Sequence, residues 1–325
     1  MQAFSMITPR TVKMLIPIFF LIEFYSPNIM YPNGILTTPD GIFTTPAQEE
    51  KPVPKAQELH KPHHVIVTPY RDRPDNLAKF IEHMGLYLSR NFVNDTFSIY
   101  VMEQADRELF SRSFLLNAGL AEIIRARPDT HCVIMHDVDL LPIVDGVPYN
   151  NCTYPTQLGS ELEHFDWKVP YLQSCGGVVS LHVNDWKKIN GMSNDYEGWG
   201  GEDDDLFARL KWRNLLYGPG RQSIVRPPKG KGVFANIEVR SKPNKGSHAK
   251  YGNNLALLKA MEQNSFRSQS DGLNDVEYLR LDDQLLRSNG TEGFDEAHIV
   301  KIVGQENCSQ PTNSTAHCVK GISSE

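Results

Sequence analysis

Two spacings of apolar residues run through the middle of the chain, and each spacing predicts a different kind of element. Short runs rich in β-branched residues predict strands over 64–70, 96–103, 131–139 and 176–183. Segments with apolar residues every three or four positions predict helices over 74–90, 111–126 and 202–215. Strands and helices therefore alternate, which predicts an α/β fold with a mixed, mostly parallel sheet flanked by helices.

The two ends of the chain lack this alternation, so we divide the chain into four segments. Within residues 1–25, the apolar run 14–22 follows two basic residues, which is typical of a signal anchor or a signal peptide. Residues 26–62 are rich in Pro and Thr and predict a flexible stem. The catalytic domain is expected over 63–285. Residues 286–325 are polar and rich in sequons, and we expect them to form a loosely ordered tail.

Composition narrows the class of protein. The chain has 325 residues, of which 40% are hydrophobic and 22% charged, as in ordinary globular proteins. A net charge of -6 and scattered basic residues speak against a nucleic-acid partner. The five cysteines form no C-x-x-C pair, so no zinc or thioredoxin-type motif is indicated. Five Asn-x-Ser/Thr sequons favour a lumenal or secreted chain and offer glycosylation sites at Asn94, Asn151, Asn289, Asn307 and Asn313.

The predicted strand over 131–139 ends in an acidic pair. Asp137 and Asp139 are two positions apart, so at the end of a strand their carboxylates point to the same side. Their mutual repulsion favours a cation beside them. A hard divalent ion takes oxygen ligands of this kind, and a nucleotide diphosphate would complete its shell. Taken alone, a D-x-D sequence is also compatible with a solvated turn.

Four consecutive acids, at 202–205, follow Trp199 and two glycines and open a predicted helix. The helix dipole would explain one or two acids in a first turn. An aromatic ring that can stack on a pyranose, beside carboxylates that accept hydroxyl hydrogen bonds, favours a sugar site instead. Arg71 and Arg73, directly after the first predicted strand, can bind phosphate oxygens. The acids alone would also fit a glycoside hydrolase, but the arginines and the D-x-D strand favour a nucleotide-sugar donor.

Six segments, in this order, resemble the successive sequence blocks of the β-1,4-galactosyltransferase family. They read PYRDRPDNL, FSRSFLLNAGL, HDVDLLP, PYLQSCGGVVSL, NGMSNDYEGWGGEDDDLFARL and DGLNDVEY, within residues 63–281. The resemblance implies a GT-A glycosyltransferase fold, a UDP-sugar donor and Mn²⁺ as the cofactor. It also implies a type II protein of the Golgi membrane with a lumenal catalytic domain, and a secreted form is the alternative.

The resemblance further implies roles for individual residues. It assigns UDP-sugar binding to Pro69, Tyr70, Arg71, Arg73, Phe110, Arg112, Asp137, Val138 and Trp199. Acceptor binding falls to Gly201, Glu202 and Asp204, and the general base is Asp203. The resemblance assigns metal binding to Asp139 and His248, and it implies a disulfide between Cys132 and Cys152. We also expect a free, buried Cys175 and a second disulfide between Cys308 and Cys318.

Three positions depart from the family pattern. Lys245 stands where a metal-binding Met is usual, three residues before His248, and a different alignment would bring Glu238 near the metal. Ser174 stands where an aromatic residue is commoner, which would leave room for a 2-acetamido group on the donor sugar. Glu197 stands where the family often has a second Trp.

We therefore predict an inverting β-1,4-galactosyltransferase in which a carboxylate takes the proton of the attacking hydroxyl. The donor is expected to be UDP-galactose or UDP-N-acetylgalactosamine. The acceptor is expected to be a glycan on a glycoprotein, glycolipid or proteoglycan, such as one ending in N-acetylglucosamine. Two alternatives stay open: a xylosylprotein 4-β-galactosyltransferase of proteoglycan linker synthesis, and a non-catalytic sugar-binding relative. The missing Met favours the non-catalytic relative, whereas intact Asp139, Glu202 and Asp203 speak against it.

Overall fold

The computed structural model describes residues 61–237, 248–287, 294–304 and 316–322, which all lie in one compact unit, Glu58–Glu325. The expected signal segment and stem lie outside these ranges and stay predictions. Within the described ranges, no helix is long and apolar enough to cross a membrane.

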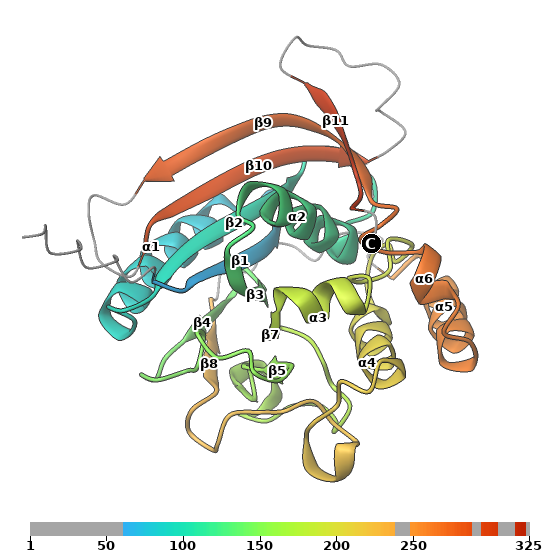
Figure 1. Cartoon of the computed structure of the whole chain (residues 1–325), viewed down its shortest axis with the longest axis horizontal. Helices are drawn as coiled ribbons and strands as arrows, with labels where there is room; N and C mark the ends of the chain where they lie inside the picture. The colour runs from blue at the N-terminus through green and yellow to red at the C-terminus, as the bar shows by residue number, and fades with distance from the viewer. Residues whose placement is uncertain (1–60, 238–247, 288–293, 305–315, 323–325) are drawn as a thin grey trace, which may run out of the picture. The chain divides into compact units, whose positions relative to one another are not determined.

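An eight-stranded mixed sheet is the centre of the described part of this unit (Figure 1). Its strand order is β11-β9-β10-β2-β1-β3-β7-β5. The middle strands β10, β2, β1 and β3 are parallel to one another, and the ladders on both sides of them are antiparallel. The strands are β1 (His63–Tyr70), β2 (Thr96–Gln104), β3 (Thr130–His136), β5 (Thr156–Gln157), β7 (Val178–His182), β9 (Glu277–Arg287), β10 (Glu296–Gly304) and β11 (His317–Lys320).

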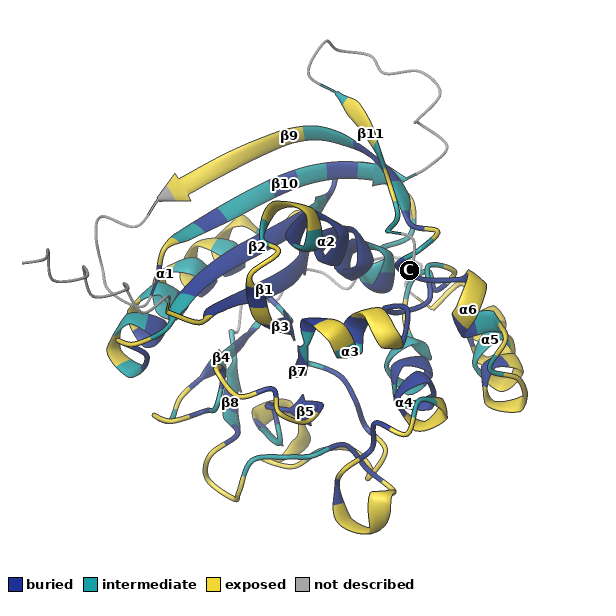
Figure 2. Cartoon of the chain, viewed as in Figure 1, coloured by how far each residue is buried: buried dark blue, intermediate teal, exposed yellow. Residues whose placement is uncertain are grey.

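Successive residues of β1 face two separate hydrophobic clusters, one on each side of the sheet. Val65 and Val67 belong to the cluster that includes α2 (Arg112–Ala126), and Ile66 belongs to the cluster that includes α1 (Pro74–Asn91). This alternation follows from the two-residue period of a strand. Strands β1, β2 and β3 are mostly buried as a result (Figure 2). The first two predicted helices and first two predicted strands are confirmed. The third predicted strand forms but ends at His136, so Asp137 and Asp139 lie in the turn that follows it. These elements bring the carboxyl ends of β1 and β3, where ligands bind in such sheets, to one edge.

A second, three-stranded sheet of described residues extends this edge. Its order is β4 (Leu140–Pro142), β8 (Val233–Asn236) and β6 (Glu161–Leu162). The antiparallel register places Leu140 opposite Asn236, and the Ile237 N–H donates to the Asp139 carbonyl at 2.8 Å. The backbone that follows β8 is therefore fixed beside the acidic pair. The other helices are α3 (Val183–Lys188), α4 (Glu202–Trp212), α5 (Tyr251–Gln263) and α6 (Arg267–Ser270), with 3₁₀ turns at Glu163–Phe165 and Pro219–Arg221.

The expectation of a loosely ordered tail from residue 286 is wrong for two segments. Strand β9 continues to Arg287, and β10 lies inside the main sheet between β9 and β2. Strand β11 pairs with β9. The sequence did not predict β10 because its buried residues do not alternate regularly with exposed ones. The sequons at Asn289, Asn307 and Asn313, and Cys308 of the expected second disulfide, lie outside the described residues.

Helix α4 is fixed to the rest of the unit by a buried cation. The Arg209 guanidinium is fully buried; its Nε donates to the Asp205 carboxylate at 2.6 Å, and its Nη1 donates to the Asp271 carbonyl at 2.9 Å. Tyr196 donates its hydroxyl to the same Asp205 carboxylate. Asp205, the fourth of the consecutive acids, therefore has a structural partner inside the protein. Its three predecessors line a cavity.

We predict that Asp205→Asn lowers the free energy of unfolding by about 3 kcal/mol, because removing one partner of a buried ion pair leaves the other charge uncompensated. Urea denaturation monitored by tryptophan fluorescence measures this loss. Asp204→Asn is the matched control, since Asp204 has the same chemistry but faces the cavity, and its effect should stay below about 1 kcal/mol. Equal losses for both variants would contradict the structural role of Asp205.

Candidate active site

A cavity of about 910 Å³ opens at the carboxyl ends of β1 and β3 and at the start of α4. It brings together all the residues that the sequence assigned to donor and acceptor binding, the general base and one of the two metal ligands. These residues are Pro69, Tyr70, Arg71, Arg73, Phe110, Arg112, Asp137, Val138, Asp139, Trp199, Gly201, Glu202, Asp203 and Asp204. The fold thus gathers side chains from four separate sequence blocks around one space.

Arg112, the first residue of α2, connects the two acidic segments. Its Nε donates to the Asp137 carboxylate at 2.9 Å, and its Nη1 donates to the Asp203 carboxylate at 2.8 Å. Burial alone would lower the pKa of Arg112, but Asp137 and Asp203 more than reverse this effect and raise the pKa. The guanidinium therefore stays charged and holds the end of β3 to the start of α4.

Asp203 has the properties of a proton acceptor. Its carboxylate faces the cavity, and 36% of its side chain is exposed to solvent. Burial raises the pKa of Asp203 to about 8, with Glu202 and Asp137 adding to the rise and Arg112 opposing it. A carboxyl group with a pKa near neutrality can take a proton from an attacking hydroxyl and release it again.

The close packing of Asp203 depends on a glycine. A Cβ atom on Gly176 would overlap with the Asp203 carboxylate. Gly176 follows Cys175, which is buried and, among the described cysteines, is the free one, as predicted. The segment before β7 therefore forms the wall against which the carboxylate rests.

Asp139 lies at the other end of the cavity. Its carboxylate accepts a hydrogen bond from Arg73 Nη1 at 3.1 Å. Burial and the neighbouring Asp137 raise the pKa of Asp139, and Arg73 opposes this rise. Asn236 and His164 line the same cavity, and the His164 Nδ1 lies 2.7 Å from the Asn236 Oδ1. The acidic pair, a carboxamide oxygen and an imidazole are ligand types that suit a divalent cation such as Mn²⁺.

His248 is not brought to this part of the cavity. Its ring contacts the Trp199 ring, with centroids 4.8 Å apart, and Tyr251 contacts Trp199 from α5 at 5.4 Å. His248 is exposed and is not among the described residues that line the cavity with Asp139. Its assignment as a metal ligand stays a prediction, and Lys245 and Glu238 lie outside the described residues.

Exposed aromatic side chains form the mouth of the cavity. Tyr171 donates its hydroxyl to the Asp204 carboxylate at 2.8 Å. Phe165, Tyr171 and Trp199 are 41%, 45% and 55% exposed, respectively, so their ring faces are available to a ligand. Such faces stack on the apolar faces of sugar rings. The sequence analysis missed Phe165 and Tyr171, although two aromatic residues in a polar segment were a usable signal.

Ser174 lines the cavity and is held from behind by two side chains that the sequence did not single out. Arg226 donates to the Ser174 carbonyl at 3.0 Å and to the Gln157 side chain at 3.0 Å. Gln157 donates to the Gly176 carbonyl at 3.2 Å. A small hydroxyl side chain therefore occupies a rigid position in the cavity wall.

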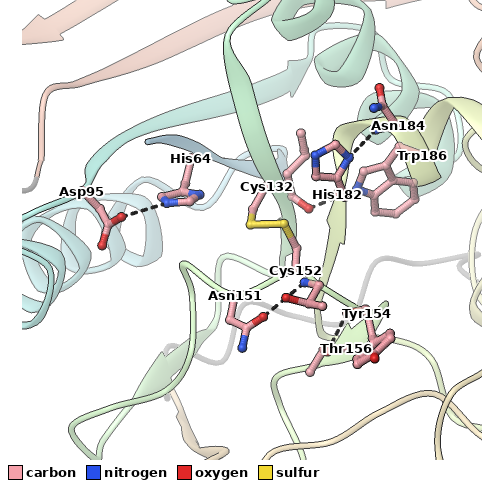
Figure 3. Close-up of a disulfide and its surroundings, with 12 residues drawn as sticks. His64, Asp95, Cys132, Asn151, Cys152, Tyr154, Thr156, His182, Asn184 and Trp186 are labelled. Carbon is pink, nitrogen blue, oxygen red and sulfur yellow. Dashed lines mark hydrogen bonds and ion pairs between the residues drawn. A yellow bond between two sulfur atoms is a disulfide. The ribbon is translucent and has the colours of Figure 1, made fainter. Parts of the chain in front are cut away.

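The disulfide between Cys132 and Cys152 is confirmed (Figure 3). Cys132 lies on β3, which leads into Asp137, and Cys152 lies in the loop after β4. The bond ties this loop to the strand that carries the acidic pair. The pairing of Cys308 with Cys318 stays a prediction.

Two family models match consecutive parts of the chain. One is described as the N-terminal region of glycosyl transferase group 7 and matches residues 51–153, and the other is described as the N-terminal domain of galactosyltransferase and matches residues 156–237. Human β-1,4-galactosyltransferase 1 is 34% identical over 225 residues, which cover 69% of this chain and 52% of the human protein. The bovine protein of the same name is 32% identical over the same length. The chain spans about half the length of these relatives.

Solved structures agree with the sequence relatives. The catalytic domain of Drosophila β-1,4-galactosyltransferase 7 in complex with xylobiose is 27% identical, with a TM-score of 0.54 over 75% of this chain and 94% of the Drosophila chain. A mutant of that enzyme in complex with manganese, UDP-Gal and xylobiose is 26% identical, with a TM-score of 0.55 and the same coverage. The mixed sheet flanked by helices is therefore a GT-A glycosyltransferase fold, as the sequence predicted.

We predict that Gly176→Ala lowers the free energy of unfolding by about 1–3 kcal/mol, because the added methyl group must displace the Asp203 carboxylate. In an Asp203→Ala background the same substitution should cost far less, since the colliding atoms are gone. Gly252→Ala is the control, because no atom lies near its Cβ position, and it should be neutral or stabilising. Urea denaturation is measured for the wild type, Gly176→Ala, Asp203→Ala, the double variant and the control. An equal loss of unfolding free energy from Gly176→Ala in both backgrounds would contradict the proposed contact.

Proposed function

Because this chain belongs to the β-1,4-galactosyltransferase family, we propose that it transfers galactose from UDP-galactose to a sugar hydroxyl of a glycan acceptor. The observation that carries the proposal is the convergence on Arg112, which joins the Asp137 carboxylate of the D-x-D segment to the Asp203 carboxylate of α4. A donor-binding acid and a proton acceptor are thereby held at a fixed spacing within one cavity.

The reaction is a single displacement with inversion at the anomeric carbon. The acceptor hydroxyl attacks that carbon while Asp203 takes the hydroxyl proton, and UDP leaves with the bonding electron pair. Arg71 and Arg73 line the cavity next to β1, where they balance the charge that develops on the diphosphate. Tyr171 and Trp199 hold the sugar rings by stacking, and Asp204 accepts a hydroxyl hydrogen bond.

Mn²⁺ is the proposed cofactor, since the mutant Drosophila enzyme was solved with manganese. Asp139 would hold it, with Asn236 and His164 as further donor groups on the cavity wall. When bound, the cation would stabilise the negative charge of the departing diphosphate. A cation would also replace Arg73 as the partner of Asp139, which frees Arg73 for the phosphate oxygens.

Two acceptor sugars fit the proposed reaction. The relatives named β-1,4-galactosyltransferase 1 support a glycan such as one ending in N-acetylglucosamine. The Drosophila structures contain xylobiose and support the alternative, a xylosylprotein 4-β-galactosyltransferase. A non-catalytic sugar-binding relative is disfavoured, because binding alone would not require a partly exposed carboxyl group with a raised pKa in the cavity.

We further propose that the chain works in the Golgi lumen as a membrane-anchored glycoprotein. The Cys132–Cys152 disulfide supports an oxidising compartment. The sequons at Asn94 and Asn151 are on exposed residues, where an oligosaccharide can be attached.

A matrix of UDP-sugars against N-acetylglucosamine and xylose acceptors, with and without Mn²⁺, tests the proposed function. UDP release that requires both an acceptor and Mn²⁺ supports it, and the acceptor that gives the higher kcat/KM decides between the two sugars. Asp139→Asn should abolish most of the Mn²⁺-dependent turnover. Binding of sugars without any UDP release would instead identify a non-catalytic relative.

We predict that Asp203→Asn lowers turnover by about 10² to 10⁴, the usual contribution of a positioned base, with donor affinity nearly unchanged. Since the base must be unprotonated, wild-type turnover should rise with pH through about 8. Arg112→Lys keeps the positive charge and should leave the pH dependence of turnover in place. Arg112→Met removes the charge that lowers the pKa of Asp203, so the rise in turnover should shift to higher pH. Turnover from UDP release and donor affinity from calorimetry measure these effects; normal turnover in Asp203→Asn would show that the base lies elsewhere.

We predict that the enzyme accepts UDP-N-acetylgalactosamine as well as UDP-galactose, because Ser174 leaves space that an aromatic ring would fill. Ser174→Tyr should lower kcat/KM for the N-acetylated donor by about tenfold or more and change that for UDP-galactose much less. Ser174→Ala serves as the control for the lost hydroxyl. Strong discrimination against the N-acetylated donor in the wild type, unchanged in Ser174→Tyr, would contradict this prediction.

A further inference from the structure

Thiol and imidazole groups gather at the end of the main sheet that is remote from the cavity. Among the described residues, His131, Cys132 and Cys152 each offer a ligand atom, and these three atoms lie within 4.8 Å of one another. The two cysteines are 20 residues apart in sequence, so no motif of the zinc-binding type marks them. The fold alone brings them next to an imidazole.

Two more imidazoles flank the same sulfur atom. The strand registers pair Cys132 of β3 with His64 of β1 on one side and with His182 of β7 on the other. Partners in register lie on the same face of a sheet. Figure 3 shows His64 and His182 on the two sides of Cys132. The ring of His131 lies 4.8 Å from that of His182 and 5.8 Å from that of His64, measured between centroids.

His64 has the arrangement of a metal ligand without a metal. It is 1% exposed, and its Nε2 lies 3.2 Å from the Asp95 carboxylate. Its Nδ1 is buried and has no hydrogen-bond partner within the described part of the chain. Histidines that bind metals usually donate their second N–H to a carboxylate in this way.

We propose that this corner is a second, thiolate-rich metal site, which binds a soft divalent cation such as Zn²⁺ through Cys132, Cys152 and His131 when the disulfide is open. His64 Nδ1 would complete the four ligands. Two cysteines with two histidines are a common donor set for zinc. Cys152 lies in a loop rather than on a strand, and opening the disulfide removes the bond that holds its sulfur to that of Cys132.

The disulfide is reduced before the cation binds. A phosphine reductant and one water convert the disulfide into two thiols and the phosphine oxide. Cation binding then releases the two thiol protons to solvent, while the histidines contribute neutral lone pairs. The disulfide and the metal site are therefore two exclusive states of the same residues.

Co²⁺ is the probe that tests this site, because tetrahedral Co²⁺ with thiolate ligands has visible d–d bands and a near-ultraviolet charge-transfer band. The oxidised full chain is reduced with a phosphine without oxygen, freed of reductant and titrated with Co²⁺ and then Zn²⁺. We expect one Co²⁺ per reduced chain, displaced by Zn²⁺, and no such bands from the oxidised chain. A reduced chain that shows no bands, or that unfolds and is not refolded by the cation, overturns the proposal.

Three variants assign the ligands. Cys152→Ser should abolish the bands, whereas Cys318→Ser, the matched control in a distant strand, should leave them. His131→Ala still closes the disulfide and so folds before reduction; its affinity for Co²⁺ should fall by about tenfold or more. Bands that persist in Cys152→Ser, that disappear in Cys318→Ser, or that have wild-type affinity in His131→Ala would each overturn the assignment.

Discussion

The arrangement of the cavity depends on the charge of Arg112. Without it, the carboxylates of Asp137 and Asp203 would repel each other across a partly dehydrated space. With it, the end of a strand and the start of a helix, 66 positions apart in sequence, are held in contact. The guanidinium can do this because it is planar and carries several N–H groups in a fixed geometry, so it serves two carboxylates at once.

The pairing of charges with nearby partners also explains why four acids can follow one another at the start of α4. Asp205 turns inward to Arg209, Asp203 meets Arg112, and Asp204 accepts the Tyr171 hydroxyl. These three acids thus have partners in different directions, as successive residues of a helix require. The helix dipole supports the whole group, but it does not determine which acid faces the ligand.

Local periodicity predicted the middle of the fold well, because β1, α1, β2, α2, β3 and α4 bury regular faces. It missed α5, where only Asn254 and Met261 are buried, and β10, whose burial is irregular. The motifs identified most of the cavity lining. They could not reveal Asn236, since its contact with His164 joins residues far apart in sequence. The family resemblance assigned His248 to the metal; its ring contacts Trp199, and the assignment stays a prediction.

The position of β10 has a consequence for how the chain is made. Strand β2 lies between β1 and β10, and its Ser98 pairs with Glu296 near the other end of the chain. During synthesis, β1, β2 and β3 emerge long before the strand that covers the open side of β2. That edge therefore stays unpaired while almost 200 further residues are translated. Contacts between residues so far apart in sequence also form slowly. An exposed strand edge is prone to pair with other chains, so the nascent protein is expected to depend on chaperones until its last strands are synthesised.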